Sequence, residues 1–163
     1  MNVIKPTVIL LRGCSGSGKN FTADFIKSLY PDSLIISNDD YFIEKYGYYK
    51  WNPKEVIKAE ASSRAKFIKA LEDKSKVIVI ANTNLIPKRF NFYLDNGKKF
   101  GYSVLSLIVE NRHEGQNIHN VKPNNLIDQE IALRKNILLT NLSFKDYLVY
   151  RIRKFVRKFT NKK

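Results

Sequence analysis

The stretch Gly13-Cys14-Ser15-Gly16-Ser17-Gly18-Lys19-Asn20 decides the fold of this chain. A continuous apolar run at residues 8–11 precedes it, and apolar residues at helical spacing follow it from Phe21 to Leu29. A strand, a glycine-rich turn and a helix in this order are typical of a phosphate-binding loop. Glycines let several backbone N–H groups face one anion, and the helix N-terminus adds its positive dipole end. The sequence therefore predicts that this stretch binds a nucleotide, with the Lys19 ammonium reaching the β- and γ-phosphates.

The last position of the motif departs from the usual pattern. Ser or Thr normally stands there and binds Mg²⁺ through its hydroxyl, whereas this chain has Asn20. The amide oxygen of Asn20 can still ligate a hard cation, although on a longer arm. We expect ATP and Mg²⁺ as cofactors and Asn20 as a metal ligand, with nucleotide binding less affected than catalysis.

The charge of the chain indicates its partners. There are 163 residues, and 29 Lys and Arg against 15 Asp and Glu give a net charge of +14. This excess favours nucleic acid as the partner and an anionic membrane surface as the second choice. A lysine-rich composition without functional meaning is the third interpretation.

The single cysteine, Cys14, excludes an internal disulfide and fits a reducing compartment. No apolar run approaches the ~18 residues of a membrane span, and the N-terminal residues lack a secretory pattern. We therefore expect a cytoplasmic, intracellular protein in which Cys14 is a small packing residue of the loop.

Strand and helix patterns alternate and predict an α/β fold, a P-loop kinase-type parallel sheet flanked by helices. The predicted strands are Thr7–Arg12 in the centre, residues 33–37 as a second buried strand, 76–81 and 102–109. The predicted helices are Lys19–Leu29 and residues 53–73, 87–98 and 124–136, the third ended by turn signals at Asn96-Gly97 and Gly101. In the second helix we expect an inward stripe of Val56, Ile57, Ala61, Ala65, Phe67, Ile68 and Leu71.

Residues 41–52 are predicted to form a loop rich in aromatic side chains. The loop either packs as a flap over the site or stacks on nucleic-acid bases, and packing is the commoner use of such residues.

Polar residues follow the second and third predicted strands, as Asn38-Asp39-Asp40-Tyr41 and Asn82-Thr83-Asn84-Leu85. Ligands of open α/β sheets bind at the carboxyl ends of the strands, so the two acids should face the same crevice as the phosphate loop. A carboxylate within hydrogen-bond reach of an attacking alcohol suits phosphoryl transfer. Acids that only cap the chain after a strand are the structural alternative.

Residues 143–163 are expected to form a basic amphipathic helix after a P-loop kinase domain at residues 1–142. Residues 143–146 resemble a capping box, and apolar residues recur at helical spacing from Leu148 to Phe159. Residues 144–163 contain eight Lys or Arg and one Asp, a net charge of +7. Packing on the domain, contact with nucleic acid and contact with a membrane surface all remain open.

In their order, these motifs resemble a family of P-loop polynucleotide 5′-hydroxyl kinases. The sequences G-C-x-G-S-G-K, D-D-Y and T-N-L are similar to the kinase domain of bacteriophage polynucleotide kinase and to zeta-toxin-like P-loop kinase domains of eukaryotic ubiquitin-ligase-binding proteins. Agreement with the second group continues at residues 47–53 and 117–121. The resemblance covers about residues 8–127.

The resemblance implies that Asp39 takes the proton from a polynucleotide 5′-hydroxyl and that Lys19 assists the transfer. Substrate-binding candidates are Asp40, Asn82, Asn84, Arg89 and Arg112.

Three positions differ from the family. Besides Asn20, the chain lacks an Asp at position 81 or 82, and Gln116 stands where an Arg is usual. Arg112 or Arg89 could substitute for that arginine.

Three functions follow from the sequence. The first is an ATP-dependent kinase of nucleic-acid 5′-hydroxyl ends. The second is a nucleotide-binding module with impaired catalysis that binds nucleic acid or a protein partner. The third is a kinase of a small-molecule alcohol, which the charge of +14 disfavours.

Overall fold

The computed structural model describes residues 5–110 and 121–137 of the chain. Four strands, β1 (Thr7–Arg12), β2 (Leu34–Ile36), β3 (Val77–Ile80) and β4 (Ser103–Ile108), form one sheet. Their order is β2-β3-β1-β4, and every paired strand is parallel to its neighbour. The predicted α/β fold with a parallel sheet is confirmed, and β1 is central as expected. The expected helix at residues 143–163 lies outside the described residues.

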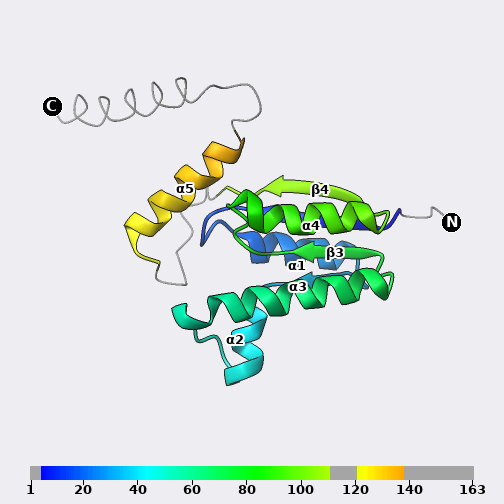
Figure 1. The fold of residues 1–163 in the computed structure, drawn as a ribbon, viewed down its shortest axis with the longest axis horizontal. Coiled ribbons are helices and arrows are strands. Elements are labelled where there is room, and N and C mark those ends of the chain that lie inside the picture. The colour runs from blue at the N-terminus through cyan, green and yellow to red at the C-terminus, as the bar shows by residue number, and fades with distance from the viewer. Residues whose placement is uncertain (1–4, 111–120, 138–163) are drawn as a thin grey trace.

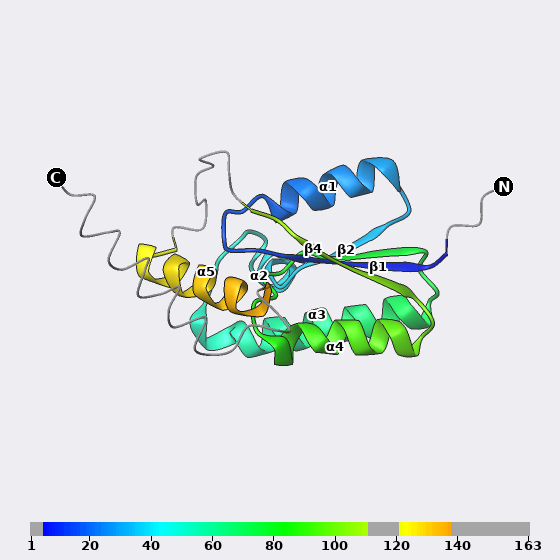
Figure 2. The ribbon, with the colours of Figure 1, turned by 90° about the horizontal axis from the view of Figure 1, so that it is seen from above.

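Helices cover both faces of the sheet (Figure 2). On one face, α1 (Lys19–Leu29) packs on Ile9 and Leu11. On the other, α3 (Val56–Glu72) and α4 (Pro87–Lys99) cover Val8 and Leu10. The apolar run of β1 does not alternate because both of its faces are buried, as is usual in parallel sheets.

The carboxyl ends of the four strands lie at one edge of the sheet, because all run in the same direction. The short helix α2 (Asp39–Tyr46) follows β2 at this edge, and α5 (Pro123–Ile137) lies beyond the tips of the strands (Figure 1). A 3₁₀ turn, η1 (Pro53–Glu55), leads from the α2 region into α3. The fold thus gathers the polar segments that follow β1, β2 and β3 at a single edge.

The prediction that residues 41–52 form a loop is wrong for its first half, because α2 extends to Tyr46. The Asp40 carboxylate accepts a 2.9 Å hydrogen bond from the Ser37 N–H, and the Ser37 hydroxyl accepts one of 3.2 Å from the Asp39 N–H. These bonds satisfy donors at the start of the helix, as a capping box does. Gly47, at φ 77°, ends it in the left-handed conformation.

The burial of β2 and the inward face of α3 also differ from the prediction. β2 is an edge strand, so that Ile36 is buried but Leu34 is 40% exposed. On α3, Ala59, Ser63 and Phe67 are buried at intervals of four residues, whereas Ile57, expected to face inward, is 81% exposed. The buried set is Ala59, Ser63, Phe67, Ala70 and Leu71.

The helix predicted at residues 87–98 is confirmed as α4, and the turn expected at Gly101 follows it, with φ 81°. The turn expected at Asn96-Gly97 is wrong, because Gly97 lies inside the helix. A Cβ at Gly97 would lie 3.0 Å from a methyl carbon of Val104 and 3.3 Å from one of Val8. The glycine therefore lets α4 approach β1 and β4 closely, which is a packing role rather than a turn signal.

Within the described ranges, no helix combines the length and the apolar character that crossing a bilayer requires.

Candidate active site

The phosphate loop between β1 and α1 depends on its glycines. Gly16 and Gly18 have φ angles of 77° and 90°, a left-handed conformation that glycine adopts without strain. At Gly13 an added Cβ would lie 2.3 Å from the Val109 carbonyl oxygen and 2.5 Å from the Ser17 hydroxyl. No larger residue fits there, since one of the two atoms belongs to the backbone of the segment after β4.

Lys19 is the buried cation of this loop. Its Nζ donates hydrogen bonds to the carbonyl oxygens of Gly13, at 3.1 Å, and Cys14, at 2.7 Å. Burial lowers the pKa of Lys19 to about 8, and the negative charge of Asp39 is among the influences that oppose this shift. The ammonium is therefore held in the loop in a position where an added anion would stabilise its charged form.

Cys14 and Asn20 differ in exposure. Cys14 is half-buried, and burial is the first cause that raises the pKa of its thiol, so the thiol stays neutral. This agrees with the predicted packing role. Asn20 is exposed on the first turn of α1.

Helix α5 is bonded to the phosphate loop and to the segment after β3. The Gln129 side-chain oxygen accepts a 2.7 Å hydrogen bond from the Ser15 backbone N–H. Near the other end of α5, Asn136 donates a 2.7 Å hydrogen bond to the carbonyl oxygen of Leu85. The negative charge of Glu130 also contributes to the raised pKa of Cys14. One face of α5 therefore borders the loop.

The two acids after β2 have different surroundings. Asp39 is the first residue of α2, and its negative charge opposes the lowering of the Lys19 pKa and contributes to the raised pKa of Tyr49. The Asp40 carboxylate instead bonds back to the Ser37 N–H. Asp39 is thus the acid whose charge acts on the phosphate-loop lysine, and Asp40 holds the start of the helix.

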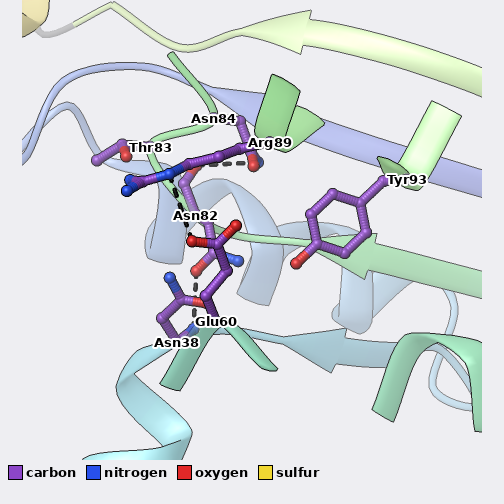
Figure 3. A pocket seen from close by; sticks show the side chains of 7 residues that line it. All are labelled: Asn38, Glu60, Asn82, Thr83, Asn84, Arg89 and Tyr93. Carbon is purple, nitrogen blue, oxygen red and sulfur yellow. Dashed lines mark hydrogen bonds and ion pairs between the residues drawn. The ribbon is translucent and has the colours of Figure 1, made fainter. Parts of the chain in front are cut away.

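A pocket lies at the carboxyl ends of β2 and β3, lined in part by Asn38, the residue before Asp39; we name it the acceptor pocket (Figure 3). Its floor includes a 2.7 Å hydrogen bond from the Asn38 N–H to the side-chain oxygen of Asn82. The Tyr93 hydroxyl points into it, and burial raises the pKa of Tyr93 to about 12. The lining residues are Asn38, Glu60, Asn82, Thr83, Asn84, Arg89 and Tyr93.

The charges of the acceptor pocket centre on Glu60. Its carboxylate accepts a 2.6 Å hydrogen bond from Arg64 and lies 3.3 Å from the Nε of Arg89. Arg64 also stacks on Phe92, with 4.7 Å between the guanidinium carbon and the ring centre. Two guanidinium groups share one carboxylate, which leaves a positive charge at the pocket that suits an anionic ligand.

Arg12 ends β1 as a buried cation. It donates a 3.1 Å hydrogen bond to the Asn84 carbonyl oxygen, and its guanidinium lies 4.1 Å from the centre of the Phe90 ring. Asn84, at φ 48°, donates a 2.8 Å hydrogen bond to the carbonyl oxygen of Leu11. These bonds tie the segment after β3 to the end of β1 and so fix the pocket relative to the phosphate loop.

The structure gathers most of the predicted site residues at one edge. Asn82, Asn84 and Arg89 line the acceptor pocket together with Asn38, the residue before the predicted base, whereas Arg112 and Gln116 lie outside the described residues. Sequence reasoning missed several residues of the site: Arg12, Glu60, Arg64, Tyr93 and Gln129. The four-residue spacing of Glu60 and Arg64 on a helix, and an arginine that ends an apolar strand, were the available signals.

Within residues 5–110 and 121–137 there is no cluster of three or more His, Cys, Asp or Glu that could hold a metal ion. Mg²⁺ in phosphate-transfer sites commonly binds one or two carboxylates together with the phosphates of the substrate. The Asp39 carboxylate and the Asn20 amide supply oxygen donors of this kind. The residues present therefore fit a magnesium ion that arrives with a nucleotide.

A comparison with protein families finds no match to this chain. Human NEDD4-binding protein 2 is 36% identical over 98 residues, which are 60% of this chain and 6% of that protein. The chain thus corresponds to a small fraction of the length of this curated relative.

Solved structures share the fold at low sequence identity. A chain of the Pnkp1/Rnl/Hen1 complex has a TM-score of 0.54 at 17% identity, over 88% of this chain and 43% of that chain. The tunicamycin resistance protein of Deinococcus radiodurans has a TM-score of 0.54 at 17% identity, over 93% of this chain and 96% of that chain. A variant of the Mycobacterium tuberculosis APS kinase has a TM-score of 0.50 at 10% identity, over 78% of this chain and 93% of that chain. The chain therefore shares with these proteins its α/β fold, a parallel sheet flanked by helices.

Proposed function

We propose that this chain is a kinase that transfers the γ-phosphate of ATP to the 5′-hydroxyl of a nucleic acid. The observation that carries the proposal is that a buried phosphate-loop lysine, Lys19, and the acid Asp39 both follow parallel strands at the same edge of the sheet. One group suits the phosphates of the donor, and the other suits the proton of an attacking alcohol.

The chain's own residues would divide the reaction as follows. The backbone N–H groups of the phosphate loop and the Lys19 ammonium hold the β- and γ-phosphates. Asp39 accepts the proton of the 5′-hydroxyl while the oxygen of that hydroxyl forms a bond to the γ-phosphorus. The bond between that phosphorus and the β–γ bridging oxygen breaks, and ADP leaves with the electron pair.

Magnesium would belong to this site with its nucleotide. Asp39 and Asn20 are the residues that would hold it, and when bound it neutralises charge on the β- and γ-phosphate oxygens. The exposed position of Asn20 leaves its amide accessible for this role.

The acceptor pocket supports a nucleic acid as the acceptor. A 5′-terminal nucleotide carries its next phosphate a few bonds from the reacting hydroxyl, and Arg89 supplies a half-exposed cation in this pocket. Glu60 holds that guanidinium in place. The net charge of +14 supports a long anionic partner as well.

A second candidate function is a nucleotide-binding module with impaired catalysis. It is favoured by the replacement of the usual Ser or Thr by Asn20 and by the lack of an Asp at Ala81 and Asn82. Such a module would keep the phosphate loop and the basic charge, and would bind nucleic acid or a protein.

The test is incubation of the protein with γ-labelled ATP, Mg²⁺ and a 5′-hydroxyl oligonucleotide. Parallel reactions contain a nucleoside, a 5′-phosphorylated oligonucleotide or no acceptor. Label transfer to the 5′-hydroxyl oligonucleotide, lost in Lys19→Ala and Asp39→Asn, is the expected result. Transfer to the nucleoside alone would favour a small-molecule kinase, and ATP binding without any transfer would favour the module.

A further inference from the structure

Three aromatic side chains between α2 and η1 are exposed to different degrees. Tyr48 is 61% exposed, Trp51 is 57% exposed and Tyr49 is 37% exposed. We name these three residues the aromatic ledge. The chain buries other large aromatic residues of the same region, such as Phe42 and Phe67, almost completely. Core packing therefore does not account for Tyr48 and Trp51.

The aromatic ledge is anchored rather than loosely attached. The buried ring of Phe42 meets the ring of Tyr49 edge to face, with centres 6.3 Å apart, and meets Tyr41 in the same way at 5.4 Å. Gly47, at φ 77°, turns the chain out of α2. The Asn52 side chain then accepts a 3.0 Å hydrogen bond from the Lys54 N–H at the start of η1. Both ends of the segment are thus held.

The aromatic ledge follows the helix that begins with the predicted base. The Tyr49 ring contacts Phe42, which lies on α2 three residues after Asp39, so Tyr49 packs back along the helix that begins with the predicted base. Burial, and to a lesser extent the negative charge of Asp39, raise the pKa of Tyr49 to about 12. Asp39 begins α2, and Gly47 directly after this helix leads into the ledge. An acceptor whose terminal hydroxyl reaches Asp39 would pass along these rings.

The surroundings of the aromatic ledge are basic. Lys50, Lys54 and Lys58 are exposed around it. The acid Glu55 is already engaged, because it pairs with Lys45 and accepts a 2.8 Å hydrogen bond from the Tyr46 hydroxyl. The Lys50 ammonium lies 5.5 Å from the centre of the Tyr46 ring. The segment therefore offers exposed rings together with exposed lysines.

We propose that the aromatic ledge is a stacking platform for the unpaired bases of a single-stranded nucleic acid whose 5′ end enters at Asp39. Every base has a π-face, so stacking on Tyr and Trp needs no particular sequence, and the lysines attract the phosphates. Bases inside a duplex are already stacked on their neighbours and cannot offer these faces. The inference rests on the proposed function and adds the strandedness of its acceptor.

Trp51 is the only tryptophan of the chain, so its emission reports directly on the aromatic ledge. The probe is an eight-nucleotide single strand with a 5′-hydroxyl, titrated into the full chain without ATP. We expect saturable quenching of the emission. With a fluorescently labelled strand, Tyr48→Ala and Trp51→Ala should each weaken binding about tenfold, in the range reported for one lost stacking contact. Phe21→Ala is the control, because Phe21 is 79% exposed on α1 and should leave affinity unchanged.

Two results would overturn the inference. One is an unquenched Trp51 with equal affinity in all variants, and the other is an affinity for a blunt duplex that matches or exceeds that for the single strand. Binding needs no phosphoryl transfer. An inactive protein that shows the expected quenching would therefore support the stacking platform and contradict the kinase proposal. The protein could instead be an active kinase whose Tyr48→Ala and Trp51→Ala variants keep the wild-type kcat/KM on the single strand. This result would support the kinase proposal and contradict the stacking platform.

Discussion

The side-chain oxygen of Gln129 accepts a 2.7 Å hydrogen bond from the backbone N–H of Ser15, a residue 114 positions earlier in the chain. This bond occupies a donor of the phosphate loop, the segment that binds nucleotide phosphates in the proposed function. Helix α5 and the nucleotide therefore act on the same loop. A charge introduced at position 129 should therefore change the affinity for the nucleotide triphosphate.

Gln129→Glu tests this relationship. The substitution keeps an oxygen that can accept the Ser15 N–H but adds a negative charge next to the loop. We expect ATP affinity to fall about tenfold or more, since the added carboxylate would repel the ATP phosphates in a partly desolvated site. Asn125→Asp adds the same charge at an exposed position of α5 and should change affinity less than twofold. Equal effects of both variants, measured by calorimetry, would show that only the overall charge matters.

The pKa of Lys19 predicts how nucleotide binding depends on pH. Because burial lowers this pKa to about 8, the free protein loses the Lys19 proton as the pH rises through 8. A bound polyphosphate favours the ammonium form, so binding above pH 8 should take up a proton. ATP affinity should then fall by up to about tenfold per pH unit above 8.

The measurement is calorimetry at pH 7, 8 and 9 in buffers of different ionisation enthalpy, which reveals the proton uptake. Lys19→Arg, whose guanidinium stays charged, should give a flat profile over this range. Lys19→Ala should weaken binding at least tenfold at pH 7. A wild-type affinity that is constant from pH 7 to 9 would contradict the assigned role of Lys19.

Asp39 and Asp40 should separate in their effects. Asp39→Asn removes the proposed base and should lower turnover by about 10²–10⁴ while ATP affinity stays within a few-fold. Asp40→Asn weakens the bond to the Ser37 N–H and should lower the free energy of unfolding by about 0.5–2 kcal/mol, with a smaller effect on turnover. Kinetics and urea unfolding of both variants distinguish these outcomes. Equal, small losses of turnover would exclude Asp39 as the base.

The strands and the phosphate loop were predictable because local patterns determine them. The apolar run of β1 and the glycines from Gly13 to Gly18 carry their structural meaning within a few residues. The same holds for α1, whose bounds match the prediction. The start of α2 was missed although Ser37 and Asp40 have capping-box spacing, because the many aromatic residues that follow suggested a loop.

The acceptor pocket could be predicted only in part, because its charges come from contacts between distant segments. Arg89 was expected at the site, but its partner Glu60 lies on α3, and only the packing of α3 on α4 brings the two together. Gln129 likewise reaches Ser15 through the placement of α5. Gly97 looked like a turn residue, since the sequence alone does not show that Val8 and Val104 press against it.

Asn20 decides between a working kinase and a nucleotide-binding module. Mg²⁺ requires nearly octahedral geometry and releases its water reluctantly. The asparagine side chain places its oxygen one atom farther from the backbone than serine does, and its NH₂ group cannot bind a cation. We therefore expect weaker binding of Mg²⁺, with Asp39 as the principal remaining carboxylate.

Asn20→Ser should raise phosphoryl transfer or lower the Mg²⁺ concentration that gives half-maximal activity. The fold should not change, because Asn20 is exposed on the first turn of α1. The control is Asn91→Ser, an exposed asparagine of α4, which should alter neither quantity. The measurement is a magnesium titration of label transfer at saturating ATP. High wild-type activity that falls in Asn20→Ser would show a site adapted to asparagine, and inactivity of both proteins would favour the nucleotide-binding module.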